Sequence, residues 1–362
     1  MSIYYSADWH VWNHRLLGGS FDNGVNRRCR ETLAVIRKAS EFVERRGGAL
    51  VACGDVFDAP RPSPQVMRAL MDAVAPLTGD DERPGLWLLA GNHDRVSSAP
   101  GDNALAPLGR VPGVRVIDSP SAHEIGETVV FFAPPSPRGV AFVDHLDEVT
   151  RGQQADVLVV HAGVEDGLTP HFLKGSRGAI DVLRLAALAK RLGAREAYAG
   201  DWHSHRAWGV DGVRVVQCGA LVPTGWDNPG RAYGRVVEGG SARVWSLPGP
   251  RFIEAQSAEA AQRALRFEFR SAGLRDINYV RVRVPRAEVA KERVALEQIA
   301  EEVGGQVDVR AEVVASVAGG VRERSFASVD AALARVVEAT VDEDERAVVL
   351  DRVRQFLAKA LM

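Results

Sequence analysis

Five short segments of the chain place Asp, His or Asn directly after an apolar run. The side chains are Asp8 with His10, Asp55, Asn92 with His93, His161, and a group of Asp201, His203 and His205. Taken singly, a histidine is usually an ordinary surface or core residue, and an aspartate after a strand is usually a helix cap or turn residue. Five such segments together indicate one shared site, because the ends of parallel strands converge at one edge of a sheet.

Side chains of these types fit a pair of divalent metal ions. Two ions about 3.5–4 Å apart need a bridging carboxylate and mixed nitrogen and oxygen ligands, and together they hold the attacking and the leaving oxygen of a phosphate ester. They also lower the pKa of a bridging water, which makes hydroxide available to attack the phosphorus. A ligand set without thiolate favours manganese, iron or zinc over copper(I) or an iron–sulfur cluster.

The elements between these segments predict an α/β fold class with layered sheets flanked by helices. Short continuous apolar runs indicate strands buried on both faces, at residues 3–7, 49–53, 86–90, 157–160 and 197–199. Apolar residues at helical spacing predict helices at 27–46, 64–75 and 180–192. The alternation of strand and helix predicts that the site lies at the strand ends.

A domain boundary is predicted at Pro248-Gly249-Pro250, after a stretch of short strands and Gly/Pro turns. We expect a catalytic domain over residues 1–250, a small α+β capping domain over 251–325 and C-terminal helices over 326–362. The apolar face of the last helix, residues 343–361, either docks on a partner protein or packs on the chain's own cap.

Within the predicted cap, strict alternation of valine and arginine puts Arg281 and Arg283 on one face of a strand. These side chains either contact phosphates or form a solvated strand face. Four tryptophans in or beside the motif loops either stack on an exposed base or line the pocket and cover the sheet: Trp9, Trp12, Trp202 and Trp208.

Composition describes an ordinary globular protein of 362 residues with 46% hydrophobic and 25% charged residues. The net charge of −2 shows no basic excess of the kind that nucleic-acid binders often carry. Three cysteines without metal-binding spacing, Cys29, Cys53 and Cys218, are expected to be reduced core thiols. Because neither a signal peptide nor an apolar run of about 20 residues is visible, we expect a cytoplasmic protein without a membrane partner. The composition, rich in Arg, Ala and Val, favours a GC-rich bacterial or phage genome.

The five segments resemble the ordered motifs of the calcineurin-like metallophosphoesterase superfamily. The matching residues are Asp8-x-His10, Gly54-Asp55-x-x-Asp58, Gly91-Asn92-His93-Asp94, Val160-His161 and the segment 200–205. The resemblance implies that Asp8 and His10 hold one metal ion and that Asp55 bridges the pair. It also implies that Asn92 and His161 hold the second ion.

The third motif also carries the expected acid. By resemblance, His93 protonates the leaving oxygen and steadies the phosphate, while Asp94 orients its ring.

The last motif departs from the family pattern of Gly-His-x-His, because this chain has Gly200-Asp201-Trp202-His203-Ser204-His205. In one register Asp201 replaces the first histidine and His203 is the second. In the other register His203 and His205 form the pair, and the following Arg206-Ala207 favours this one. His203 is a metal ligand in both.

Within the superfamily the chain resembles the SbcD and Mre-type DNA repair nuclease subunits. The resemblance rests on residues 6–10, 54–63 and 218–224, and Asp58 stands where some of these relatives carry histidine beside the site. It implies a manganese-dependent DNA exo- and endonuclease, working in recombination and repair as a dimer with an SMC-like ATPase subunit of the SbcC type. The same metals also hydrolyse small esters, so the alternative is a phosphodiesterase or phosphatase acting on a cyclic nucleotide or nucleotide ester.

Overall fold

The computed structural model of the chain describes most of residues 1–311. Outside the described part lie residue 98, the short segments 170–173, 176–177, 227–232, 242, 267–269, 272–273 and 276, and all residues from 312 onward. Residues 1–311 pack as one compact unit. The helices predicted at 326–362, including 343–361, therefore lie outside the described residues.

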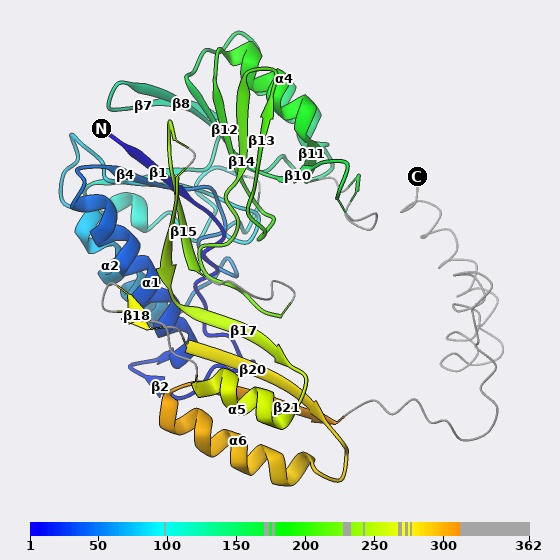
Figure 1. Ribbon diagram of the computed structural model, residues 1–362. Helices are drawn as coiled ribbons and strands as arrows, with labels where there is room; N and C mark the ends of the chain where they lie inside the picture. The colour runs from blue at the N-terminus through cyan, green and yellow to red at the C-terminus, as the bar shows by residue number, and fades with distance from the viewer. Residues whose placement is uncertain are drawn as a thin grey trace, which may run out of the picture. The chain divides into compact units, whose positions relative to one another are not determined.

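Two six-stranded sheets carry the residues of interest (Figure 1). The first has the order β16-β15-β1-β4-β5-β6, with β1 at Ile3–Ser6, β4 at Ala49–Ala52, β5 at Leu86–Leu89, β6 at Val114–Ile117, β15 at Tyr233–Glu238 and β16 at Val244–Pro248. The second has the order β13-β14-β12-β9-β8-β7, with β7 at Ser121–Ile125, β8 at Thr128–Ala133, β9 at Val157–His161, β12 at Glu196–Gly200, β13 at Arg206–Val210 and β14 at Val213–Gln217. The motif-bearing strands β1, β4 and β5 run parallel to one another, as do β9 and β12.

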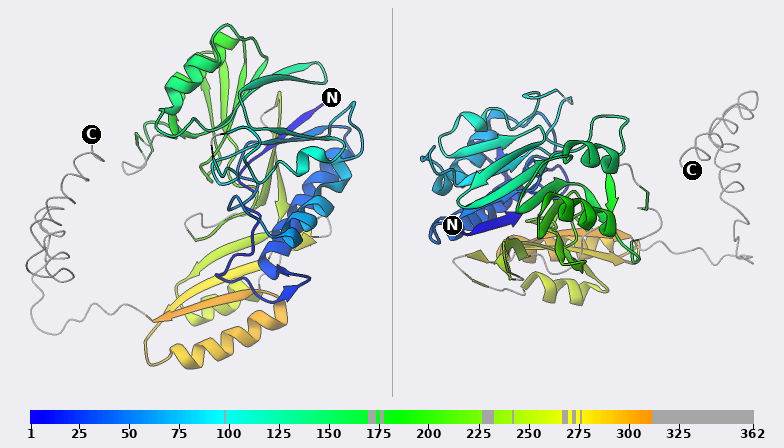
Figure 2. Two further views of the ribbon diagram at one scale, coloured as in Figure 1. Left: turned by 180° about the vertical axis from the view of Figure 1, so that it is seen from behind. Right: turned by 90° about the horizontal axis from the view of Figure 1, so that it is seen from above.

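Helices cover the outer faces of both sheets, so each sheet is buried on two sides. The inner faces share one core, in which the Tyr5 ring of β1 stacks on the Tyr198 ring of β12. Helices α1 (Arg27–Glu44) and α2 (Pro64–Val74) lie on the first sheet, and α3 (Phe142–Val149) and α4 (Val182–Leu192) lie on the second (Figure 2). The predicted fold class, layered sheets flanked by helices, is confirmed.

Local sequence explains where these helices begin and end. The side chain of Asn26 accepts a hydrogen bond from Cys29 N at the start of α1, and Ser63 does the same for Val66 N in front of Pro64. Asp181 caps α4 at its first turn, and Gly193 ends that helix in the left-handed conformation that glycine adopts without strain. The remaining short elements are β2 (Phe21–Asp22), β3 (Val25–Asn26), β10 (Gly163–Glu165), β11 (Ala179–Asp181), and the 3-10 turns η1 (Ala75–Leu77) and η2 (Leu108–Arg110).

A three-stranded parallel sheet follows the two large ones in sequence. Its strands are β17 (Pro250–Ala255), β20 (Ile277–Val284) and β21 (Gln306–Ala311), with α5 (Ala258–Arg266) and α6 (Val289–Val303) on one face, and β18 (Arg270–Ser271) and β19 (Leu274–Arg275) form a separate pair (Figure 1). Val280, Val282 and Val284 are buried against these helices, which leaves the arginines between them on the opposite face. The sheet begins at the predicted boundary, and the division of the chain into domains stays a prediction.

The three cysteine thiols are free and buried, as predicted. Among the described residues, no helix is both long and apolar enough to cross a bilayer.

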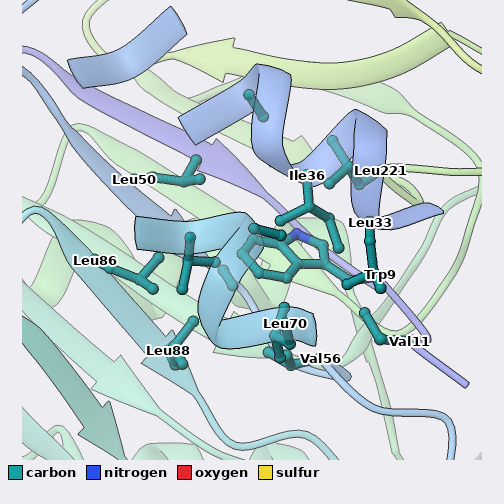
Figure 3. Packing of buried hydrophobic residues seen from close by; sticks show 14 of the residues in the cluster. Trp9, Val11, Leu33, Ile36, Leu50, Val56, Leu70, Leu86, Leu88 and Leu221 are labelled. Carbon is teal, nitrogen blue, oxygen red and sulfur yellow. The ribbon is translucent and has the colours of Figure 1, made fainter. Parts of the chain in front are cut away.

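Trp9 belongs to the core between the first sheet and its helices (Figure 3). It is 1% exposed, lies among Ile36 and Leu70, and donates a hydrogen bond from Nε1 to Ser6 Oγ at 2.9 Å. A side chain so enclosed cannot stack on a nucleic-acid base. For Trp9 the base-stacking alternative is therefore wrong, and the core-packing alternative holds.

Candidate metal centre

The loops that leave the strand ends are tied to one another through the backbone. Asp8 N donates to Gly54 O at 3.0 Å and His10 N donates to Asp55 O at 3.1 Å, which joins the end of β1 to the end of β4. Asp8, His10, Asp55 and Asp201 all have positive φ angles, between 45° and 86°. Non-glycine residues seldom adopt this conformation, and such strain gathers at functional sites.

Two glycines in the motifs leave room for the functional side chains. A Cβ atom on Gly54 would lie 2.0 Å from Nδ1 of His161, and one on Gly91 would lie 2.1 Å from Oδ1 of Asp55. Any larger residue would displace these side chains, which gives a physical reason for Gly-Asp in the second motif and Gly-Asn in the third.

One buried group contains Asp8, Asp55 and His161, each exposed by 2% or less. Nε2 of His161 lies 3.3 Å from Asp55 Oδ2 and 2.9 Å from Asn92 Oδ1. Nδ1 of His161 lies 2.8 Å from Cys53 O, and because a carbonyl oxygen only accepts, Nδ1 carries the proton. In the neutral ring, the lone pair of Nε2 therefore points toward the carboxylates and Asn92.

A second group forms around His10 and His203. Their Nε2 atoms face each other at 3.1 Å, and His10 Nε2 lies 3.9 Å from Asp55 Oδ2. Nδ1 of His10 lies 3.0 Å from Asp58 Oδ1, and Nδ1 of His203 lies 2.9 Å from Thr224 Oγ1. When each ring carries its proton on Nδ1, beside these oxygens, the two Nε2 lone pairs face each other, which is unfavourable unless a cation lies between them.

The donor set fits divalent metal ions. Asp8 Oδ2 is buried and has no hydrogen-bond partner in the described part of the chain, an uncommon state for a carboxylate oxygen. His10, His161 and His203 each place Nδ1 against an oxygen and Nε2 toward other donor groups, the arrangement that orients metal-ligating histidines. Asp55 reaches both groups and can serve as the shared carboxylate.

Without a metal ion, the charges of the group are balanced only by protons. Burial raises the pKa of Asp8 to about 7, against the favourable charge of His161. For His161, burial opposes protonation, but the charge of Asp55 and its hydrogen bond, followed by Asp201 and Asp8, raise the pKa to about 10. Although burial acts to raise it, the pKa of Asp55 stays well below its usual value, because His161 and His10 stabilise the carboxylate.

The structure gives His93 and Asp94 different partners from those expected. Nδ1 of His93 donates to the backbone carbonyl of Asp58 at 2.8 Å, while Asp94 is fully buried. The Asp94 carboxylate accepts from the backbone N–H groups of Gly91, Val56 and Phe57 at 2.9, 3.2 and 2.8 Å. The expectation that Asp94 orients the His93 ring is therefore corrected. Asp94 joins the second motif loop to the third, and Asp58 holds the ring.

In the last motif, Asp201 contacts two of the other predicted ligands. Asp201 N donates to Asp8 Oδ1 at 2.9 Å, and its own Oδ1 lies 3.8 Å from His161 Nε2. Nδ1 of His205 instead lies 3.1 Å from the carbonyl oxygen of Cys218. This geometry favours the register of Asp201 with His203 over the pair His203 and His205 that the sequence favoured.

The two registers predict opposite results for two conservative variants. Asp201→Asn removes a charge beside His161 and is expected to weaken Mn²⁺ binding by about 10-fold or more. His205→Gln is expected to leave the affinity unchanged. Isothermal titration calorimetry measures both, and a large loss in His205→Gln alone would restore the register that the sequence favoured.

The predicted substrate-binding residues fall into two places. Asp58 lies at the site, between Nδ1 of His10 and the His93 ring. Arg281 is paired with Asp308 at 3.0 Å and with Glu254 at 3.6 Å, and its guanidinium lies 3.7 Å from the Trp226 ring centroid. Its charge is thus largely balanced within the chain, while Arg283 is exposed on the same strand face.

Two of the remaining tryptophans cover backbone and neighbouring side chains. The Trp202 ring packs on Gly163, where a Cβ atom would lie 2.3 Å from Cε2 of the indole. Trp208 donates from Nε1 to Asp166 Oδ2 at 3.1 Å. Trp208 also packs against the core of the second sheet, so both contacts agree with rings that cover neighbouring structure, and Trp12 is partly exposed.

Two supporting residues were not predicted as functional. Thr224 contacts His203, and buried Gln217 holds the last motif by donating to Trp202 O at 2.7 Å while accepting from Val164 N at 3.0 Å. Thr224 lies in a segment that the family resemblance had already indicated, but its partner is 21 residues away, and only the folded chain shows the contact.

The layered α/β fold, with a metal-competent group at the strand ends, agrees with the resemblance of the five motifs to calcineurin-like metallophosphoesterases. Among curated proteins, the chain is 25% identical over 204 residues to the SbcD subunit of the nuclease SbcCD from Rhodobacter capsulatus. That match covers 55% of this chain and 45% of the relative, so the chain spans less than half of the relative's length. No family model matches the chain.

Solved structures show weaker likenesses. One is a candidate 5′-nucleotidase from Staphylococcus aureus, with 16% identity and a TM-score of 0.39 over 66% of this chain and 50% of that one. Another is the phosphopantetheinyl hydrolase of Mycobacterium tuberculosis, with 14% identity and a TM-score of 0.33 over 60% of this chain and 88% of that one. TM-scores this low carry no argument about the function of this chain.

Proposed function

We propose that the chain is a two-metal phosphodiesterase whose substrate is DNA. The observation that carries the proposal is the opposed Nε2 pair of His10 and His203, together with the unpartnered Oδ2 of Asp8 among the described residues. One divalent ion would be held by Asp8, His10 and His203. The other would be held by Asn92, His161 and Asp201, and Asp55 would contribute to both sites. When bound, the ions supply charge stabilisation and a nucleophilic hydroxide near neutral pH, with Mn²⁺ the cation we expect.

In this proposal His93 is the general acid. Its Nδ1 proton is held by Asp58 O, so the proton that exchanges is the one on Nε2. Protonated His93 gives this proton to the leaving oxygen as the ester bond breaks. Asp58 sets the direction of the ring, and Asp94 fixes the loops that carry Asn92 and His93.

DNA is proposed as the substrate because the curated relative is a subunit of the nuclease SbcCD. By the same similarity we propose that the chain works in recombination and repair as a dimer, with an SMC-like ATPase of the SbcC type as partner. The internal pairing of Arg281 removes one expected phosphate contact from this proposal, which leaves Arg283 as the candidate on that face.

The substrate class is tested by incubating the purified chain with Mn²⁺ and comparing linear DNA, hairpin DNA and bis-p-nitrophenyl phosphate. We expect cleavage of both DNA forms and of the small diester, abolished by EDTA. Cleavage of the small diester alone would contradict DNA as the substrate and favour the small-molecule alternative. Failure to cleave any of the three while Mn²⁺ is bound would contradict the phosphodiesterase proposal itself.

A further inference from the structure

The ring of His203 has a specific neighbour outside the ligand group. Oγ1 of Thr224 lies 2.9 Å from His203 Nδ1, and Thr224 follows the buried Leu221 and Val222 in the loop after β14. When Nδ1 donates to this hydroxyl oxygen, Nε2 keeps the lone pair that faces His10. In this tautomer the hydroxyl fixes the orientation of the ring, so that Nε2 can bind a cation.

The loop that carries Thr224 is in turn held by Arg28 of α1. The guanidinium is buried, with the residue only 6% exposed, and it donates from Nη2 to the carbonyl oxygen of Thr224. From Nη1 it donates to Leu16 O at 3.0 Å, so it fastens two loops at once. A buried charge is retained at such a position only when its hydrogen bonds are satisfied.

Arg28 also contacts the three-stranded sheet. Its guanidinium carbon lies 5.0 Å from the centroid of the Phe252 ring in β17, and that ring stacks on Tyr279 of β20 with centroids 5.0 Å apart and planes 15° apart. The Tyr279 hydroxyl donates to the carboxylate of Glu31, one turn further along α1. A continuous set of contacts thus runs from the three-stranded sheet through α1 to the His203 ring.

We infer that Thr224 is a positioning residue for His203, and that Arg28 links this positioning to the packing of the three-stranded sheet. The inference rests on the proposed metal centre and extends it to the residues that hold one of its ligands in place. Whatever moves β17 and β20 against α1 would shift the Thr224 carbonyl, and with it the hydroxyl that orients the ring. Binding of a metal ion beside His10 and His203 would then respond to contacts made on the three-stranded sheet.

The test compares Mn²⁺ affinities of four variants by isothermal titration calorimetry. Thr224→Val keeps the shape of the side chain and loses the hydroxyl, and we expect the affinity to fall by about 10-fold. Thr224→Ser keeps the hydroxyl and is expected to restore wild-type affinity, which a purely structural role would not do. Arg28→Met, which retains side-chain length without the donors, is expected to lower the affinity as well.

Thr150→Val is the matched control. Thr150 is buried, and its Oγ1 donates to Leu146 O at 2.6 Å at the end of α3. We expect it to lower the melting temperature in EDTA as much as Thr224→Val does, with Mn²⁺ affinity unchanged. Wild-type affinity in Thr224→Val would overturn the positioning role, and wild-type affinity in Arg28→Met alone would overturn the link to the sheet. If the wild-type chain binds no Mn²⁺, the proposed metal centre fails and this inference fails with it.

Discussion

Replacing His93 with glutamine is expected to lower the rate of phosphodiester cleavage by about 10²–10⁴-fold while Mn²⁺ affinity stays at the wild-type value. Nδ1 of His93 is occupied by the carbonyl oxygen of Asp58. Glutamine can occupy similar space and form a hydrogen bond, but it has no proton to give at neutral pH. The variant therefore separates proton donation from metal binding.

The basicity of the leaving group determines how much each substrate depends on His93. A p-nitrophenolate ion departs without needing a proton, whereas the alkoxide of a DNA strand is a strong base that needs one. The loss in His93→Gln should therefore be much larger for DNA than for bis-p-nitrophenyl phosphate. Steady-state rates on both substrates, together with titration of Mn²⁺, are the measurements.

His123→Gln is the matched control for His93→Gln. His123 lies in β7, and its Nε2 is 3.0 Å from Ser121 Oγ, so the same substitution there removes an imidazole that takes no part in the site. We expect wild-type rates for this control. An equal loss on both substrates in His93→Gln, or a concurrent loss of Mn²⁺ binding, would contradict the role of His93 as general acid.

The positions of the candidate ligand residues could be predicted in part from sequence, because these residues follow strands of a simple pattern. Short apolar runs before Asp8, Asp55 and His161 define strands buried on both faces, and the ends of parallel strands meet at one edge of a sheet. This reasoning places Asp8 and Asp55 together at one edge of the first sheet. His161 ends β9 of the second sheet, so its position beside Asp55 depends on how the two sheets pack, which the strand pattern does not give. Apolar residues at helical spacing located α1, α2 and α4 to within a few residues.

Trp9 shows a signal that was present but not used. Ala7, Trp9 and Val11 are all buried, while Asp8 and His10 between them contribute to the site. The alternation of apolar and ligand residues places the indole on the side away from the metal centre. Base stacking by Trp9 could have been excluded from the sequence on this ground.

The register of the last motif could not be read locally. Both Asp201 and His205 flank His203 at a spacing of two residues, and both side chains can bind a metal ion. The preference for Asp201 rests on its Oδ1, 3.8 Å from His161 Nε2, and on the hydrogen bond of its N–H to Asp8 Oδ1, a contact across 193 residues. Likewise, the charge of Arg281 is balanced by Asp308 and Glu254, which no pattern around Arg281 indicates.

Replacing Asp55 with asparagine is expected to abolish the stabilisation of the chain by Mn²⁺. Asparagine can still accept the hydrogen bond from His93 N, which is 2.9 Å from Asp55 Oδ1, so the loop is expected to persist. The charge that is shared by both ligand groups is lost, however. At a concentration 100 times its dissociation constant, Mn²⁺ should stabilise the wild type by about 2.7 kcal/mol, seen as a rise of several degrees in melting temperature, and Asp55→Asn should show no rise.

Asp156→Asn is the matched control for Asp55→Asn. Asp156 accepts from Val129 N at 2.8 Å and lies just before β9, at the end of that strand opposite His161, so the same substitution there leaves the site intact. The Asp156→Asn variant should keep the full Mn²⁺-dependent rise in melting temperature. A comparable rise in Asp55→Asn would show that Mn²⁺ binds elsewhere on the chain and would remove Asp55 from the centre.

The pH dependence of Mn²⁺ affinity tests whether His161 is a metal ligand. Without metal, the pKa of His161 is raised to about 10, against the cost of its burial, by the charge of Asp55 and its hydrogen bond, and then by Asp201. Below that pH the ring holds a proton that Mn²⁺ must displace, so the wild-type affinity should rise with pH up to about 10. In Asp201→Asn the weaker of these two charge effects is gone, the pKa of His161 falls, and the rise should level off at lower pH. An affinity that does not change with pH in the wild type would mean that Mn²⁺ displaces no proton from His161, and hence that His161 is not a ligand.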